Sequence, residues 1–372
     1  MKETYLEIDI DKIRNNIINI KMISLGSMYC AVVKANAYGL GAVEISKNIE
    51  DLVDYFAVAK LSEALALRKN SIKKPILILG YVDLEDISLC SKYDIDISIY
   101  DYDYARKIND MGYKINCHLA LDTGHSRLGF RNFEIDRILL LKEFKNINIV
   151  SAFSHFSTSD EEDDSFTKEQ YEKFNDILGD VNKEFALDFV HISNSAAVLN
   201  HKIFKNMIRV GISMYGLYPS LYVSEVSPVK LERAFNLYSK VSFVKNVKKG
   251  TSISYGRTYI TKKDTKVATV CIGYADGYMR AFSNIGEVKI NSKTCRVLGR
   301  VCMDQIMVDV TGIDVNIGDK VTIYEDIDKE AEKIGTISYE LMTSIDMRVI
   351  RQYYRNNKLI KTEDYMGEIY EN

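Results

Sequence analysis

The feature that most constrains this chain is a regular alternation of short apolar runs with amphipathic stretches between about residues 28 and 216. An apolar run followed by a helical pattern, repeated many times, is typical of β-α units that build a parallel sheet. Eight such runs are present, beginning near residues 28, 55, 75, 96, 115, 147, 189 and 207. Eight units predict an α/β fold, a closed (β/α)8 barrel of the TIM type. In one of the helical stretches Ser165 is expected to be the N-cap.

The second part of the chain has a different pattern. Residues 220–229 have the composition of a connector, and the segments after them alternate apolar and polar residues with the period of two that indicates strands. We therefore expect a barrel domain in residues 1–225, with the first few residues free to join the second domain. Residues 226–372 are expected to form a mostly-β C-terminal domain.

The amino-acid composition of the chain limits the kinds of molecule that it is expected to bind. The 49 basic and 52 acidic residues are well interspersed, and a net charge of −3 argues against a nucleic-acid surface or a polybasic membrane patch. No apolar run approaches the ~20 residues that span a bilayer, and the charged N-terminus does not resemble a signal peptide. We expect a cytoplasmic protein that acts on a small neutral or zwitterionic molecule. The six cysteines form no C-x-x-C pair, so no metal site or disulfide framework is predicted, and most should be buried thiols.

Lys34 stands at the polar end of the first apolar run, in AVVKANAYGLG. Catalytic groups of barrel enzymes gather at the carboxyl ends of the strands, where Lys34 is expected to lie. A partly desolvated lysine loses its proton more easily than a free one, so it is a candidate nucleophile or base. A lysine after a strand is more often only a solvated charge, and the surrounding motifs favour the catalytic interpretation here.

Seven motifs in order make the chain resemble the bacterial alanine racemases, which are fold-type III enzymes dependent on pyridoxal 5′-phosphate. The motifs are AVVKANAYGLG, LDTGHSRLGF, HISNSAA, RVGISMYG, SISYGRTY, GYADGY and GRVCMDQIMVDV. The resemblance covers nearly the full length. It implies an isomerase that interconverts L-alanine and D-alanine with two bases on opposite faces of the α-carbon, and that supplies D-alanine for peptidoglycan.

The resemblance also implies roles for individual residues. Lys34 binds the cofactor aldehyde and serves as one base, and Tyr255 serves as the other, because a single base would mostly restore the starting enantiomer. Arg209 donates to the pyridine nitrogen and stays protonated, which weakens the ring as an electron sink and suppresses side reactions. The other cofactor contacts are expected from Tyr38, His155, Asn194, Ser195, and the backbone amides of Gly211 and Ile212.

Substrate contacts follow from the same resemblance. Arg127 is expected to hold the carboxylate of a small amino acid, for which a planar guanidinium is suited, and to support Tyr255. Met303 and Asp304 match a loop that closes the pocket from a partner subunit, and Tyr274 matches an entrance residue. The chain is therefore expected to form a head-to-tail homodimer in which Tyr255 and Met303 complete the other subunit's site.

Two positions depart from the family pattern. Ala120 stands where many relatives carry a carbamylated lysine, so Arg127 is expected to have chloride or ordered water in place of that anion. Met347 stands where many relatives carry a tyrosine near the entrance. Serine or other small amino acids therefore remain an open alternative to alanine as substrates.

Two further classes resemble parts of this chain. One is a decarboxylase with the same two-domain architecture, but Cys302 does not lie in the reactive-cysteine motif of those enzymes. The other is a non-catalytic pyridoxal-phosphate binding protein that consists of the barrel alone. SISYGRTY and GRVCMDQIMVDV lie in the second domain, which favours the racemase.

Overall fold

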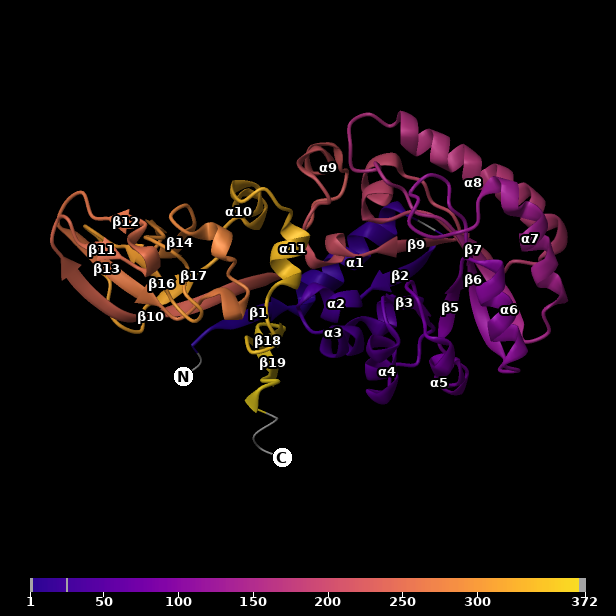
Figure 1. The fold of residues 1–372 in the computed structure, drawn as a ribbon, viewed down its shortest axis with the longest axis horizontal. Helices are drawn as coiled ribbons and strands as arrows, with labels where there is room; N and C mark the ends of the chain where they lie inside the picture. Colours follow the sequence, from indigo (N-terminus) through magenta and orange to yellow (C-terminus); the bar gives the residue numbers. More distant parts are fainter. Residues whose placement is uncertain (1–2, 25, 368–372) are drawn as a thin grey trace. The chain divides into compact units, whose positions relative to one another are not determined.

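The computed structural model describes residues 3–24 and 26–367 (Figure 1). The chain divides into two compact units. The barrel unit comprises Lys12–Ala37 and Ala42–Arg233. The sheet unit comprises the residues before Lys12, the short segment Tyr38–Gly41, and the chain from Ala234 onward.

The barrel unit contains eight parallel strands that close on themselves in sequence order, from β2 to β9 (Figure 1). They are β2 (Met28–Val32), β3 (Tyr55–Val58), β4 (Ile76–Ile78), β5 (Asp96–Ile99), β6 (Ile115–Ala120), β7 (Ile147–Phe153), β8 (Phe189–His191) and β9 (Met207–Val210). Each coincides with one of the eight apolar runs, so the predicted (β/α)8 barrel is confirmed. Nearly every residue of these strands is buried, because helices cover the outside and side chains fill the inside.

Helices alternate with these strands and lie on the outside of the barrel (Figure 1). They are α1 (Ile10–Ile23), α3 (Ala42–Ile49), α4 (Leu61–Lys69), α5 (Ile87–Lys92), α6 (Tyr102–Asp110), α7 (Ile135–Leu140), α8 (Ser165–Glu184) and α9 (Leu221–Val226). The longest, α8, buries Phe174, Ile177, Leu178 and Val181, the i, i+3, i+4, i+7 stripe of a helix with one apolar face. Within the described residues, no helix has both the length and the apolar character needed to cross a bilayer.

Two local expectations were wrong. Ser165 is the first residue of α8 rather than its N-cap, which is Asp164, and the Ser165 amide donates to Oδ1 of Asp163 over 2.9 Å. Residues 220–229 are not only a connector, because they contain α9. Ser220 caps that helix, since its hydroxyl accepts the amide proton of Val223 over 3.2 Å.

The sheet unit is built around one long strand, β10 (Phe235–Val247). Its first eight residues alternate buried and half-buried, which is the predicted period-two pattern of a strand with one face in a core. The sheet runs in the order β15-β14-β17-β10-β1-β18-β19, with β13 pairing with β10 and β16. The strand β1 (Tyr5–Asp9) lies antiparallel to β10 and parallel to β18. The predicted mostly-β second domain is confirmed.

The remaining elements of this unit are shorter. Its other strands are β11 (Ser252–Ile253), β12 (Tyr259–Ile260), β13 (Thr265–Val270), β14 (Glu287–Ile290), β15 (Lys293–Arg296), β16 (Ile306–Asp309), β17 (Lys320–Thr322), β18 (Ile350–Arg355) and β19 (Lys358–Glu363). Among its described residues after Ala234, the α-helices are α10 (Ile327–Lys333) and α11 (Ser338–Thr343), and short 3-10 helices begin at Tyr255, Tyr274 and Arg280. Four of the six cysteines are buried, as expected.

A buried arginine holds the segment Tyr38–Gly41 within the sheet unit. Arg351 of β18 is fully buried, and its Nη2 and Nε donate to the carbonyl of Gly39 over 2.9 and 3.1 Å. The hydroxyl of Tyr353, on the same strand, donates to the carbonyl of Leu40 over 3.0 Å. The chain just beyond Lys34 is therefore held by two side chains that lie more than 300 residues later in the sequence.

Gly216 is expected to be far less replaceable than Gly112. Both have positive φ, +90° and +80°, so alanine is strained at either position. At Gly216 an added Cβ would also lie 1.9 Å from the carbonyl oxygen of Glu232, whereas at Gly112 nothing lies within 4 Å. Gly112→Ala should lower the thermal unfolding midpoint by roughly 2–4 °C for about 1 kcal/mol of strain. Gly216→Ala should lower it by several times more, and equal shifts for the two variants would contradict this reading.

Candidate active site

Lys34 lies two residues beyond β2, at the carboxyl end of the barrel strands, and the backbone after it turns in the left-handed sense. Ala35, Asn36 and Ala37 have φ angles of 51°, 53° and 52°, and Tyr38 follows with 56°. A left-handed conformation costs an L-residue roughly 1–2 kcal/mol. Strain of this kind persists only where surrounding contacts enforce it, and it gathers at functional sites.

Side chains from the barrel unit enforce this turn. The amide of Ala35 donates to Oε1 of Glu63 over 2.6 Å, and the amide of Ala42 donates to Oδ1 of Asn36 over 2.8 Å. Glu63 belongs to α4, so the next β-α unit helps to hold the turn. The left-handed turn after Lys34 was not predicted from the sequence. Asn36, which tolerates positive φ, was the available signal.

The ammonium group of Lys34 lies among other cations. Burial lowers the pKa of Lys34, the positive charges of Arg127 and Arg209 lower it further, and Glu63 acts in the opposite direction. A lysine with a lowered pKa has a larger neutral fraction near pH 7. That neutral form is the one that attacks a carbonyl carbon or accepts a proton.

Arg209, on β9, is 4% exposed, and four hydrogen bonds hold its guanidinium. Nη1 donates to Nδ1 of His191 over 2.6 Å, and Nη2 donates to the carbonyls of Ser154 (2.8 Å) and Ile192 (3.1 Å) and to Nδ1 of His155 (3.1 Å). Burial lowers the pKa of Arg209 to about 10, so it remains a cation at neutral pH. A guanidinium carries five N–H groups, so it retains donor capacity for a ligand.

His155 follows β7 and faces a second imidazole. Its ring centroid lies 5.4 Å from that of His125, with the planes at 64°. Burial, and then the charges of Arg209 and Arg127, hold the pKa of His155 well below its usual value. Burial and Arg127 also lower the pKa of His125. Both rings are therefore neutral at pH 7 and offer apolar faces to an aromatic ligand. His125 was not predicted as a site residue, although it stands within DTGHSRLGF.

The loops after β8 and β9 supply hydroxyl and amide donors. The hydroxyl of Ser195 accepts the amide proton of Gly211 over 3.0 Å, which leaves its own O–H to donate elsewhere. Oδ1 of Asn194 accepts the amide proton of Ala197 over 2.9 Å and so shapes the loop. A one-turn helix starts at Ile212, and the first amides of a helix have no carbonyl partner within it. This donor set suits a phosphate group.

Arg127 lies on the loop after β6. Oδ1 of Asp122 accepts the amide protons of Gly124 and Ser126 over 3.1 and 2.9 Å and fixes the conformation of this loop. Ala120, the last residue of β6, is 1% exposed, and its methyl group offers Arg127 no charge. The charge of Arg127 is exerted instead on the neighbouring lysine and imidazoles.

The other predicted site residues lie in the sheet unit. The amides of Tyr274 and Ala275 donate to the carbonyls of Cys302 and Met303, each over 3.0 Å, which places GYADGY and GRVCMDQIMVDV side by side. Tyr255 is 70% exposed, Met303 53% and Tyr274 43%. All three side chains are therefore accessible in the single subunit.

Asp304 and Tyr38 have defined surroundings in the sheet unit. Arg348 bridges Asp304 and Asp276 with N–O distances of 2.8 Å to each, and these carboxylates raise the pKa of Arg348. Tyr38 is 8% exposed, and its ring lies 6.0 Å from that of Tyr339. Burial raises the pKa of Tyr38, so its hydroxyl stays protonated and can donate a hydrogen bond.

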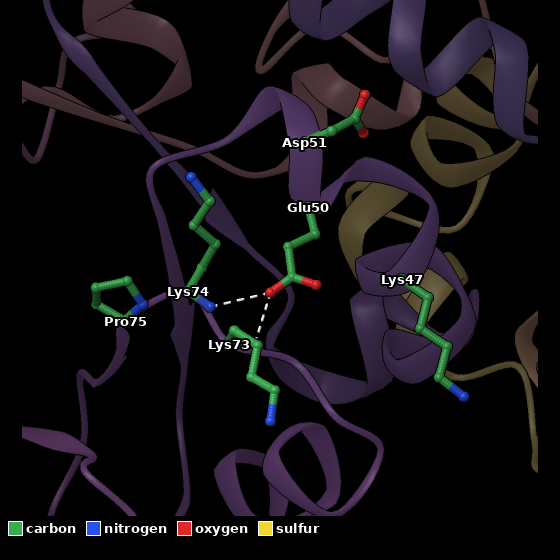
Figure 2. Close-up of a pocket in the computed structure, with 6 residues that line it drawn as sticks. All are labelled: Lys47, Glu50, Asp51, Lys73, Lys74 and Pro75. Atoms are coloured by element: carbon green, nitrogen blue, oxygen red, sulfur yellow. Dashed lines mark hydrogen bonds between the residues drawn. The ribbon is translucent and has the colours of Figure 1, made fainter.

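A pocket at the amino ends of β3 and β4 is separate from these residues. Figure 2 shows its lining, which is Lys47, Glu50, Asp51, Lys73, Lys74 and Pro75. Oε1 of Glu50 accepts the amide protons of Lys73 and Lys74 over 2.5 and 2.9 Å, so Glu50 ties the loop before β4. Asp51 is paired with Arg14 over 2.6 Å. The pocket is at the opposite end of the strands from Lys34, and its acidic groups already have partners.

Two family profiles match the chain. The profile "Alanine racemase, N-terminal domain" matches residues 8–219, and "Alanine racemase, C-terminal domain" matches residues 234–353. Among curated proteins, the alanine racemase of Clostridium perfringens strain SM101 is 40% identical and covers 98% of this chain and 99% of its own length. The alanine racemase of Methanococcus maripaludis is 41% identical, covering 94% and 98%.

Solved structures agree over the same length. The alanine racemase of Clostridium difficile 630 is similar with a TM-score of 0.93 and 37% identity, and the match covers 98% of this chain and 99% of that one. The alanine racemase of Bacillus anthracis with bound L-Ala-P is similar with a TM-score of 0.95 and 36% identity, covering 99% of both chains.

The pKa of Lys34 should move in opposite directions in two variants. Arg127→Gln removes a neighbouring cation and should raise it, whereas Glu63→Gln removes an anion while keeping an oxygen for the Ala35 amide, and should lower it. The rate of trace acetylation of Lys34, followed against pH by peptide mass spectrometry on cofactor-free protein, gives the pKa. Exposed Lys249 serves as the internal control. Shifts in the same direction for both variants would refute the electrostatic assignment.

Proposed function

The chain belongs to the alanine racemase family, a family of isomerases, and from this premise we propose that it interconverts L-alanine and D-alanine with pyridoxal 5′-phosphate bound covalently to Lys34. The observation that carries the proposal is the environment of Lys34, a lysine with a lowered pKa beside Arg127 and Arg209 at the carboxyl end of a barrel strand. The alternatives of a decarboxylase and a non-catalytic binding protein have no comparable support.

The barrel residues fit the three functional groups of pyridoxal phosphate. The amine of Lys34 suits the aldehyde, and the buried guanidinium of Arg209 suits the pyridine nitrogen, to which it can only donate. The free O–H of Ser195 and the amides of Gly211 and Ile212 suit the phosphate, to which Tyr38 would add its protonated hydroxyl. When bound, the cofactor supplies a ring that stabilises negative charge at the substrate's α-carbon.

Two bases are proposed, the amine of Lys34 and the hydroxyl of Tyr255. Inversion requires a proton to leave one face of the α-carbon and another to arrive on the opposite face, so each side needs a group that can hold a proton. The lowered pKa of Lys34 supports its role on one face. Tyr255 then serves the opposite face, within a site that a second subunit completes.

Arg209 is proposed to bias the reaction toward racemisation. A cation with a pKa of about 10 donates a hydrogen bond to the pyridine nitrogen without giving up its proton at neutral pH. A cofactor held in this way would keep an unprotonated ring, and Arg209 would thereby favour rapid return of a proton to the substrate over competing reactions.

We also propose a head-to-tail homodimer. Tyr255, Met303 and Tyr274 are all substantially exposed in the sheet unit, as expected if a second copy covers them. In this arrangement Met303 and Asp304 close the pocket of the partner, and Tyr274 narrows its entrance. Arg127 would bind the substrate carboxylate together with the Met303 amide.

The proposed substrate is alanine, and serine is the second candidate. The Bacillus anthracis relative was solved with L-Ala-P, which supports a site for a small amino acid. Met347, at the position of the family's entrance tyrosine, is 57% exposed and brings no hydroxyl group to that position. A physiological role in supplying D-alanine to peptidoglycan, in the cytoplasm, completes the proposal.

Incubation with L-alanine in heavy water tests the activity. We expect deuterium at the α-carbon together with loss of optical activity, and Lys34→Ala should slow both by roughly 10²-fold or more, as removal of a catalytic base does. L-serine is run alongside, and faster turnover of serine would reverse the substrate assignment. Release of carbon dioxide or absence of exchange would refute the racemase proposal.

Mixing two inactive variants tests the shared site. A Lys34→Ala subunit and a Tyr255→Phe subunit each lack one base, yet a mixed head-to-tail dimer has one complete site and one site lacking both. After dissociation and reassociation at equal amounts, about a quarter of wild-type activity should return, because half of the dimers are mixed and each has one working site of two. No recovery, with mixed dimers demonstrated by mass spectrometry, would show that both bases come from one subunit.

A further inference from the structure

A chain of polar side chains crosses the interior of the barrel and ends at Arg209. Nη1 of Arg209 lies 2.6 Å from Nδ1 of His191, Nε2 of His191 lies 3.0 Å from Nδ1 of His118, and Nε2 of His118 lies 3.3 Å from Oδ2 of Asp96. The hydroxyl of Tyr55 donates to the same oxygen of Asp96. The two histidines are fully buried, and Arg209 and Asp96 are each 4% exposed.

The direction of each hydrogen bond between Arg209 and Asp96 follows from the chemistry of Arg209. A guanidinium has no acceptor, so Nδ1 of His191 must accept. The proton of a neutral His191 is then on Nε2 and is donated to Nδ1 of His118. That leaves the proton of His118 on Nε2, where it is donated to the carboxylate of Asp96. Three bonds therefore share one polarity, from a cation at one end to an anion at the other.

The surroundings of His191 agree with this direction of the hydrogen bonds. Burial, and then the charge of Arg209, hold the pKa of His191 well below its usual value, so the ring is neutral at pH 7. In this scheme His118 accepts at Nδ1 and carries its proton on Nε2. The ring of His191 stacks on that of Phe153, with centroids 5.0 Å apart and planes at 3°, which limits its rotation. Asp96 is the carboxylate that closes the chain.

We infer that Asp96 is a positioning residue, which fixes the protons of His118 and His191 on Nε2 so that Arg209 meets an acceptor and is held in one orientation. This inference rests on the proposed function in one respect, since it is the pyridine nitrogen that Arg209 is oriented to meet. Asp96 lies at the amino end of β5, two imidazole rings from Arg209.

Loss of the acceptor at position 96 has a defined consequence. With nothing to receive its Nε2 proton, His118 is more stable with the proton on Nδ1, facing His191. His191 must then carry its own proton on Nδ1, which points at an arginine N–H from a distance of 2.6 Å. Two donors cannot remain that close, so the guanidinium has to turn away. The disturbance at Arg209 therefore originates at Asp96 without direct contact between them.

Nitrogen NMR of the intact protein tests the proton positions without any substitution. The chain has five histidines, so selective ¹⁵N labelling gives a readable spectrum of the full-length protein, recorded with and without pyridoxal phosphate. We expect His118 and His191 each to be neutral, with the single ring proton on Nε2, both with and without pyridoxal phosphate. A proton on Nδ1 of either ring, or a doubly protonated ring, would overturn the inference.

Two substitutions at position 96 test whether Asp96 acts as a hydrogen-bond acceptor or only fills space. Asp96→Leu has no acceptor and should move both histidine protons to Nδ1 and lower kcat by roughly tenfold or more, as loss of a partner behind a site residue does. Asp96→Asn keeps an acceptor oxygen and should preserve the proton positions, with kcat within about threefold of wild type. Wild-type proton positions in Asp96→Leu, or equal losses of kcat in both variants, would refute the role.

Asp101→Asn is the matched control. Asp101 follows the same strand at its other end and caps α6 by accepting the amide proton of Tyr104 over 2.8 Å, a role that asparagine fills equally well. It should leave both histidines and kcat unchanged. If Asp96→Leu does not fold, the proton positions in the wild-type spectrum, together with the proton positions and kcat of Asp96→Asn, test the inference. A wild-type protein without racemase activity would defeat the proposed function, whereas the proton positions can be read in either case.

Discussion

The buried guanidinium of Arg209 is the constraint on which the barrel site depends. An uncompensated buried charge costs several kcal/mol, so the barrel has to surround this cation with acceptors. The carbonyls of Ser154 and Ile192, which follow β7 and β8, and the imidazoles of His155 and His191 meet that need. Satisfying one side chain on β9 thereby sets the conformation of two neighbouring strand ends.

The charge of Arg209 also acts on Lys34, the lysine proposed to bind the cofactor. Arg209 and Arg127 both lower the pKa of Lys34, and the same two arginines keep His155 neutral. A cluster of cations is unfavourable on its own, but it suits the phosphate of the proposed cofactor and the carboxylate of the proposed substrate. The contacts that enforce the strained left-handed turn after Lys34 also fix the backbone position from which the Lys34 side chain extends.

The architecture could be predicted from the sequence because its signal is local. Strands buried on both faces require continuous apolar runs, and all eight runs became barrel strands. The site residues were predicted through motifs, whose chemistry depends on residue type. The left-handed turn was not predicted, because four consecutive non-glycine residues have positive φ there and only Asn36 among them tolerates that conformation readily. The hydrogen-bonded series from Asp96 to Arg209 was also missed. Its bonded partners are 18 to 73 residues apart in the sequence and meet only because the barrel closes.

The polar side chains inside the barrel contribute little to folding stability but fix the direction of the hydrogen bonds there. The interior of such barrels is usually filled by branched apolar side chains, and replacing a buried ionic network by apolar groups of similar volume is often neutral or stabilising. Asp96, His118, His191 and Arg209 occupy that volume here with hydrogen bonds of a single polarity. Such a layer adds little to folding, but it permits one arrangement of protons. If Arg209 presents a donor to a ring nitrogen, as proposed, that restriction favours the site, because the fold sets the direction of the hydrogen bonds before a ligand binds.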